Sequence, residues 1–262
     1  MKLKMYQVDA FADKLFSGNP AAVVILESTL KDEDMQSIAA ENNLSETAFV
    51  SIHESPASIR WFTPSIEVDL CGHATLASAR ILFDYYPDLA GEEINFNSKS
   101  GVLKITKVED GLCLNFPSDL PVTIKSDPLF LEILSIEPLM LLRGKDDYLA
   151  VFENQKQIKS MQPNFSLFKK LDARGLVISA PGDEVDFVSR CFYPEAGIEE
   201  DPVTGSAHTM LTPYWASQLS KDELEAHQLS KRGGKLNCRL QNNRVYISGG
   251  SVIYFEGTIS IV

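Results

Sequence analysis

From Arg60 the chain reads RWFTPSIEVDLCGHATL, and from Arg190 it reads RCFYPEAGIEEDPVTGSAH. Both stretches begin with Arg-x-Phe-x-Pro, continue through an acidic loop and reach a glycine that opens a helix-like segment. Arg60 and Gly72 are 12 positions apart, and Arg190 and Gly205 are 15 positions apart. Two copies of one strand, loop and helix explain this match better than chance does. Two copies of so long a unit predict a pseudo-symmetric fold of two lobes and not a solenoid.

Hydrophobic periodicity places further elements around these two stretches. We expect lobes at 1–118 and 119–262, with a hinge at 116–121 and terminal strands that can cross between the lobes. In the first half, strands are predicted at 4–11, 20–26, 46–52, 57–63, 93–98, 101–110 and 111–117, and helices at 32–43 and 73–86. In the second half, strands are predicted at 148–154, 175–181, 185–194, 233–241, 244–250 and 251–262, and helices at 164–173 and 205–219.

The composition excludes several classes of partner. The 24 Lys and Arg residues against 36 Asp and Glu give a net charge of -12, so a broad basic field for nucleic acid or anionic lipid is not expected. No apolar stretch approaches the roughly 20 residues of a membrane span, and the N-terminal residues lack the apolar core of a signal peptide. Four cysteines without a CxxC pair, and four histidines without a ligand pair on one helix face, predict reduced thiols in the cytoplasm and no metal site.

The two glycine turns have a possible chemical role. A helix that begins near Gly72 or Gly205 exposes unpaired N–H groups and partial positive charge, which suits an anion. If the lobes face each other, both helix ends would hold the carboxylate of one small molecule in a cleft. The ordinary interpretation is that Thr204 and Ser206 are N-caps and that the glycines only form turns. The duplication favours the functional interpretation.

Proton abstraction next to a carboxylate suits such a cleft. A cofactor-independent racemase needs two bases, commonly one thiol from each lobe. Cys71 is suitably placed in the first copy, but the second copy offers Thr204 and Ser206, and Cys191 lies on the preceding strand. Racemisation by two thiols is therefore disfavoured, and Cys71 is interpreted as a small buried residue.

Four acid–base candidates remain, each with an ordinary alternative. Glu46 stands where a loop meets a strand, and it could instead be a surface or capping residue. His73 lies in the first helical turn, where the positive helix end favours neutral imidazole, and it could instead bond to nearby backbone. Asp201 precedes a proline that keeps it in the loop, and it could be a turn residue. His208 lies one turn into its helix and is the weakest candidate.

These residues lie in motifs that resemble the signature blocks of the PhzF-like family, named for the phenazine-biosynthesis isomerase. The blocks come in family order over nearly the whole chain: YQVDAF, FSGNPAAVV, AAENNLSETAFV, IRWFTPSIEVDLCGHATLASA, VSRCFYPEAGIEEDPVTGSAH and LSKRGGKL. The resemblance implies an α/β (α+β) diaminopimelate-epimerase-like fold. In that fold each of two lobes is a curved, barrel-like and mostly antiparallel sheet around a central helix, with the active site between the lobes.

The resemblance also implies roles for particular residues. The family's catalytic glutamate falls on Glu46, its histidine on His73, its aspartate on Asp201 and its serine on Ser206. Asn19 falls where related epimerases contact the substrate carboxylate.

The implied reaction is an isomerisation in which the glutamate removes a proton from one carbon and returns it to another. No metal, flavin or nicotinamide is expected, and a cytoplasmic homodimer with a small carboxylate substrate is implied. Phenazine production is not inferred, because fold analogy fixes a class of chemistry better than a substrate. The alternatives are an amino-acid racemase or epimerase and a non-catalytic small-molecule binding protein.

Overall fold

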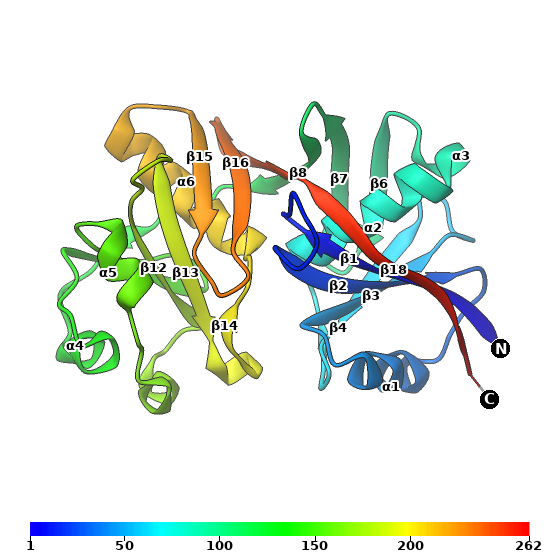
Figure 1. The fold of residues 1–262 in the computed structure, drawn as a ribbon, viewed down its shortest axis with the longest axis horizontal. Helices are drawn as coiled ribbons and strands as arrows, with labels where there is room; N and C mark the ends of the chain where they lie inside the picture. Colours follow the sequence, from blue (N-terminus) through cyan, green and yellow to red (C-terminus); the bar gives the residue numbers. More distant parts are fainter. Residues whose placement is uncertain (262) are drawn as a thin grey trace. The chain divides into compact units, whose positions relative to one another are not determined.

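The computed structural model describes residues 1–261, apart from the side chain of residue 196. The chain folds as two compact units, the first formed by residues 1–115 with those from 248 onward and the second by residues 116–247. In Figure 1 the first unit runs from blue through cyan to green and includes the red C-terminal strand, and the second runs from green to orange. The terminal strand, for which the sequence left a crossover open, thus belongs to the first unit.

The first unit is a mostly antiparallel sheet around a buried helix. Its β1 pairs antiparallel with both β2 and β18, while β2–β3 and β4–β6 are parallel pairs. The elements are β1 (Lys2–Ala10), β2 (Asn19–Leu26), α1 (Asp32–Asn42), β3 (Glu46–Ser51), β4 (Ser58–Phe62), β5 (Glu67–Val68), α2 (Gly72–Tyr85), α3 (Pro87–Ala90), β6 (Glu93–Ser98), β7 (Gly101–Val108), β8 (Gly111–Pro117) and β18 (Ser251–Ser260).

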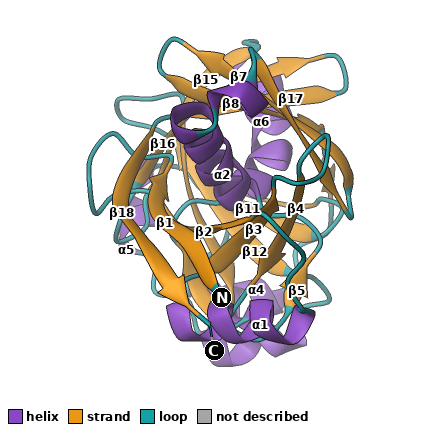
Figure 2. Ribbon diagram, turned by 90° about the vertical axis from the view of Figure 1, so that its right-hand side faces the viewer, coloured by secondary structure: helices purple, strands orange, loops and turns teal. Residues whose placement is uncertain are grey.

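Helix α2 lies in the core of this unit. It is buried from Gly72 to Phe83 except at Arg80, and it packs against β1, β2, β3 and β18. Figure 2 shows the helix with these strands around it. A helix that is apolar on nearly all sides has to be buried all round, which is why the sheet curves about it.

The second unit is built in the same way. Most of its strand pairs are antiparallel, with parallel pairs at β11–β12 and β13–β15. The elements are β9 (Val122–Thr123), α4 (Pro128–Leu134), β10 (Met140–Arg143), β11 (Asp147–Val151), α5 (Gln155–Ser160), η1 (Phe165–Lys170), β12 (Gly175–Pro181), β13 (Phe187–Tyr193), η2 (Pro194–Ala196), β14 (Ile198–Asp201), α6 (Gly205–Leu219), β15 (Glu223–Gln228), β16 (Gly234–Gln241) and β17 (Arg244–Gly249). The helix predicted at 164–173 is a 3-10 helix over Phe165–Lys170. Helix α6 is buried from Gly205 to Ala216 except at Ser206 and Thr209.

The repeat recognised in the sequence has the same strand register in both units. Trp61 on β4 pairs with Val68 on β5, and Cys191 on β13 pairs with Asp201 on β14. In each copy the first partner follows the motif arginine directly, and the second stands four positions before the helix-opening glycine. The three extra residues of the second copy are accommodated between the paired strands, where η2 forms.

The motif arginine makes two equivalent contacts in both copies. Arg60 Nε and Nη2 donate to the two carboxylate oxygens of Glu67 at 2.7 and 2.9 Å. Arg190 Nε and Nη2 donate to Glu200 in the same fork at 2.6 and 2.9 Å. Each guanidinium also lies over the phenylalanine two residues later, with 5.2 Å from Cζ to the ring centroid in the first copy and 5.1 Å in the second. Residues two apart on a strand share a face, so Arg-x-Phe places the cation over the ring.

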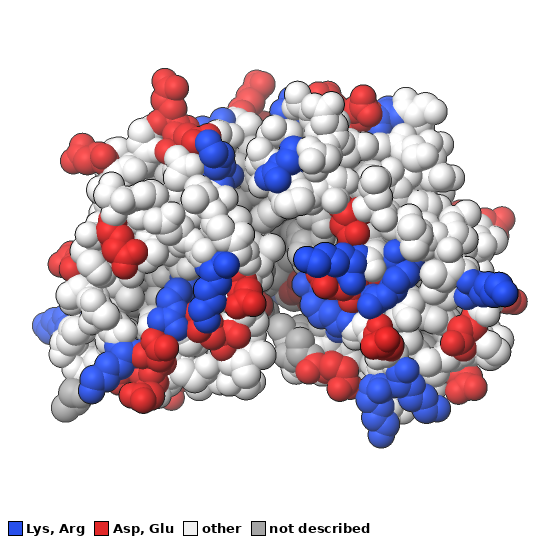
Figure 3. Space-filling model, turned by 180° about the vertical axis from the view of Figure 1, so that it is seen from behind, with Lys and Arg blue, Asp and Glu red and all other residues white. Residues whose placement is uncertain are grey.

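The surface carries both signs of charge. Figure 3 shows Lys and Arg interspersed with Asp and Glu on the face in view, without a broad basic field there. Within the part of the chain that the structure describes, no helix is long and apolar enough to cross a membrane.

Candidate active site

Four of the predicted site residues meet at one place in the first unit. Asn19 opens β2 and Glu46 opens β3, and the parallel register Ala21↔Glu46 brings the starts of these strands together. Gly72 is the first residue of α2 and His73 the second. The starts of two neighbouring strands and the N-terminus of the central helix therefore bring these four residues together. We call this group the first half-site.

The His73 ring is held between Asn19 and Glu46. Asn19 Nδ2 donates to His73 Nδ1 at 3.1 Å. Because an amide nitrogen only donates, Nδ1 is the accepting nitrogen, and a neutral ring carries its proton on Nε2. His73 Nε2 lies 3.3 Å from Glu46 Oε2, in an alignment that falls short of a hydrogen bond. The proton-bearing nitrogen thus faces the predicted acid/base.

Burial keeps this histidine neutral. His73 is 4% exposed, and desolvation lowers its pKa from 6.5 to about 3. The Glu46 side chain is 15% exposed and its Oε2 is buried, so its carboxylate is mostly enclosed. A neutral imidazole can donate to a carboxylate or orient it, but it does not supply a compensating positive charge at neutral pH.

Cys71 completes the group around His73. It is the N-cap residue of α2, is 6% exposed, and its Sγ lies 3.5 Å from His73 Nδ1. None of the four cysteines forms a disulfide among the described residues, and all four are buried, as the sequence predicts for Cys71. Cys191 is fully buried on β13, and burial raises the pKa of its thiol well above the ordinary value. A buried thiol of raised pKa stays protonated near neutral pH, so it does not supply the thiolate that would act as a base. This agrees with the prediction that racemisation by two thiols is disfavoured.

The second half-site lies around the start of α6. Asp201 ends β14 and is 8% exposed, and it accepts a hydrogen bond from Thr204 Oγ1. Thr204 occupies the N-cap position, as Cys71 does in the first copy, but its hydroxyl does not cap the helix. Gln228 links the turn, since its Nε2 donates to Asp201 O at 2.7 Å and its Oε1 accepts from Thr204 N at 2.8 Å. The helix entrance is therefore fixed by side chains other than an N-cap.

Ser206 has a partner that the sequence did not reveal. Arg174 Nη2 lies 3.2 Å from Ser206 Oγ and donates to it. The guanidinium is fixed from behind, because Nε and Nη2 both donate to the buried Asp147, with 3.0 Å from Nε to Oδ1. Tyr193 OH also donates to Asp147, at 3.3 Å. Arg174 precedes its strand in an exposed loop, and no spacing pattern separates it from the other surface cations.

His208 has an internal role in α6. Its Nδ1 donates to Thr204 O at 2.8 Å, so the neutral ring leaves Nε2 without a proton. The side chain is fully buried, and burial lowers its pKa to about 4. Among the residues that the structure describes, Nε2 has no hydrogen-bond donor, and the ring lies near Phe187 with centroids 5.9 Å apart. These contacts agree with the alternative that His208 packs and bonds internally.

The two neutral histidines give a prediction for stability against pH. In the unfolded chain these two histidines bind protons below about pH 6.5. In the folded chain they stay neutral until the pH reaches their lowered pKa values. Stability is therefore expected to fall as the pH drops below about 6.5, by at most about 1.4 kcal/mol per pH unit for each histidine.

Urea unfolding at about pH 7.5 and about pH 5.5 measures this dependence above the range in which ordinary carboxylates titrate. His208→Gln and His73→Gln should each reduce the loss of stability between the two pH values. An unchanged loss in both variants would contradict the assignment of these histidines as neutral.

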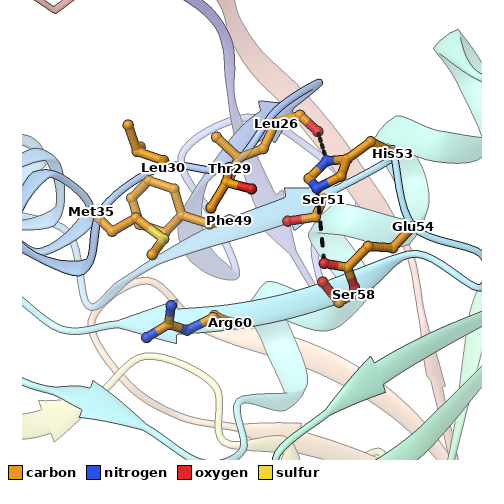
Figure 4. Close-up of a pocket in the computed structure, with 10 residues that line it drawn as sticks. All are labelled: Leu26, Thr29, Leu30, Met35, Phe49, Ser51, His53, Glu54, Ser58 and Arg60. Atoms are coloured by element: carbon orange, nitrogen blue, oxygen red, sulfur yellow. Dashed lines mark hydrogen bonds and ion pairs between the residues drawn. The ribbon is translucent and has the colours of Figure 1, made fainter.

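A small pocket lies elsewhere in the first unit. Figure 4 shows that its lining combines an apolar part, Leu26, Leu30, Met35 and Phe49, with His53, Glu54 and Arg60. None of the predicted site residues lines it. Arg60 is bound to Glu67 and Asp32, and His53 lies 3.4 Å from Leu26 O, so its polar side chains are engaged in the local structure.

Comparison with known proteins places the chain in a family. The PhzC-PhzF family, described as "Phenazine biosynthesis-like protein", matches residues 8–257. An uncharacterized isomerase of Pseudomonas aeruginosa is 46% identical over 261 residues, covering all of both chains. The crystal structure of a PhzF family protein of Enterococcus faecalis superposes over all of both chains with a TM-score of 0.96 and 45% identity.

A more distant likeness concerns the fold alone. A hydroxyproline epimerase of Agrobacterium vitis, at 9% identity, aligns with a TM-score of 0.64 over 98% of this chain and 92% of its own. The fold is thus the diaminopimelate-epimerase-like fold predicted from the sequence. The chain belongs to the PhzC-PhzF family of phenazine biosynthesis-like proteins, and it is an enzyme of the isomerase class.

Proposed function

We propose that this enzyme is a cofactor-independent isomerase that moves a proton within a small carboxylate-bearing substrate, with Glu46 as the acid/base. The observation that carries the proposal is the enclosed pair of Glu46 and neutral His73, 3.3 Å apart in the first unit. A proton shuttle needs one group that is a base in one step and an acid in the next, and a carboxylate in an enclosed site meets that need.

The proposed reaction has two proton transfers. The Glu46 carboxylate takes a proton from one substrate carbon, and the electron pair of the broken C–H bond delocalises toward a conjugated acceptor in the substrate. The Glu46 carboxyl, whose proton exchanges with solvent while it is held there, then protonates another carbon, so atoms and charge balance. His73 is assigned to orient the carboxylate through Nε2–H, and Asn19 to fix the ring by its bond to Nδ1.

The second half-site is assigned to substrate binding. Asp201 is assigned as the third catalytic group, while the turn at Gly205 and the hydroxyl of Ser206 supply hydrogen-bond donors to a carboxylate, as the turn at Gly72 does in the first copy. Both half-sites are assigned to one substrate in this proposal, as the sequence predicts. A cytoplasmic homodimer belongs to the same proposal.

The corresponding N-cap positions favour this reaction over racemisation by two thiols. Cys71 precedes Gly72 in the first copy, and Thr204 precedes Gly205 in the second. A hydroxyl is too weak a base to replace a thiolate, so the symmetric pair of bases is missing.

Deuterium transfer tests the proposal. A panel of small carboxylates with acidic C–H bonds is incubated with the enzyme in D₂O, and the position of deuterium is read by NMR. Isomerisation moves the double bond and labels a second carbon, whereas racemisation labels only the α-carbon. Tight binding without any exchange would favour the non-catalytic alternative and overturn the proposal.

A further inference from the structure

The first half-site brings together three side chains of the kind that bind zinc. Glu46, Cys71 and His73 each offer one ligand atom, and these atoms lie within 4.8 Å of one another. Thiolate, imidazole and carboxylate are the ligands that Zn²⁺ takes in proteins, and three protein ligands with one open position are typical of accessible zinc sites. We propose that this half-site is a binding site for a thiophilic divalent cation, Zn²⁺ in the first place.

The geometry of Cys71 and His73 fits such an ion. For tetrahedral zinc with ordinary Zn–S and Zn–N bond lengths, the sulfur and the nitrogen are about 3.6 Å apart. Cys71 Sγ and His73 Nδ1 are 3.5 Å apart. Because Asn19 Nδ2 donates to Nδ1, that nitrogen carries a lone pair and no proton, as a metal ligand must. An ion that took this place would replace the Asn19 contact and the thiol proton.

Glu46 lies where a third group is needed. Metal-bound histidines usually donate their other ring N–H to a carboxylate, which fixes the ring and strengthens it as a ligand. His73 Nε2 is buried and lacks a well-aligned acceptor among the described residues, and Glu46 Oε2 lies 3.3 Å from it. Glu46 is thus assigned to act on the ion through His73 Nε2 or as a ligand itself, since its carboxylate oxygen lies within 4.8 Å of the other two ligand atoms.

The repeat provides an internal comparison. In the second copy the N-cap is Thr204, and the residue two positions later is Ser206. These hydroxyls are poor ligands for a thiophilic ion, so the corresponding turn lacks the pair that makes the first turn a metal site. The cysteine and the histidine thus give the first turn a property that the duplicated architecture alone does not supply.

A bound ion would block the enzyme. Glu46 held by a cation, or by a metal-bound His73, is a weaker base, and the ion would fill the space beside it. Zinc is therefore expected to inhibit proton transfer. That consequence rests on the proposed function, whereas the binding itself does not.

Cobalt absorption tests the binding without any substrate. Co²⁺ is added to the whole protein in metal-free buffer with a phosphine reductant, and the near-ultraviolet band of a cobalt–thiolate bond is recorded. We expect one equivalent of Co²⁺ to produce the band and Zn²⁺ to remove it by displacement. Cys71→Ser should abolish the band. Cys113→Ser, which removes another buried thiol of the same unit, should retain it.

Two further variants keep the test decisive if Cys71→Ser does not fold, as judged by circular dichroism. His73→Gln and Glu46→Gln keep the thiol and should each weaken Co²⁺ binding about tenfold or more. A wild-type protein without the band, a band that persists in folded Cys71→Ser, or unchanged affinity in both other variants would overturn the proposal. Deuterium transfer without zinc binding would overturn it while leaving the proposed function intact.

Discussion

Glu46→Gln is expected to slow deuterium transfer by about a hundredfold to ten-thousandfold, the usual contribution of one general acid–base group. The substituted amide keeps the size of the side chain and its place at the start of β3, but it can neither take a proton from carbon nor return one. Because the side chain of Glu46 is mostly enclosed, solvent cannot easily replace it as the base.

The control for this variant is Glu54→Gln, the same substitution in the same unit. Glu54 lines the separate pocket of Figure 4, 3.9 Å from His53, and it has no contact with His73 in the structure. Its deuterium transfer should equal that of the wild type. Full turnover by folded Glu46→Gln on an identified substrate would show that another residue is the acid/base.

Much of the fold was predictable because the duplication is written in the sequence. Arg-x-Phe-x-Pro, the acidic loop and the helix-opening glycine are local features, and each copy folds them with the same strand register. Asn43 was also a sound stop signal, since it takes the left-handed conformation that ends α1. Because a glycine opens the helix in each copy, the sequence also predicted where both central helices begin.

Some helices were not predicted because the segments that form them are short. Helix α4 begins with Asp127 as N-cap and Pro128 in its first turn, and α5 begins with a capping box of Asn154 and Gln157. Both patterns are known start signals, but helices of 7 and 6 residues have too few turns to show a period.

The candidate site was only partly predictable for a different reason. Glu46, His73 and Asp201 could be proposed as site residues because they lie in recognisable blocks. Arg174 acts through contacts with Asp147 and Ser206, which are 27 and 32 positions away in the chain. The sequence gives such pairs no period and no fixed offset, so only the folded strands bring them together.

Arg190→Ala is expected to destabilise the protein by about 3–5 kcal/mol, the cost of removing the buried cation from an ion pair and from two further acceptors. Arg190 is 8% exposed and is bidentate to Glu200. Its Nη1 also donates to Ile158 O at 3.1 Å and to Met161 O at 2.7 Å, at the end of α5. The variant leaves the Glu200 charge and two carbonyls without these donors.

The matched control is Arg60→Ala, the same change at the corresponding position of the first copy. Arg60 makes the same fork with Glu67, but its side chain is 31% exposed and its other partner, Asp32, is 73% exposed. Water can replace the bond to Asp32, and Glu67 keeps a second cation because Lys99 Nζ lies 2.6 Å from its Oε2, so a loss of only about 1 kcal/mol is expected. Free energies of unfolding from urea titrations compare the two, and Arg190→Lys should lie between Arg190→Ala and the wild type because one ammonium cannot form the fork. The fork to a glutamate is the contact that both arginines share. Equal losses of unfolding free energy in the two alanine variants would therefore mean that this fork, and not the burial of Arg190, determines the contribution of each arginine.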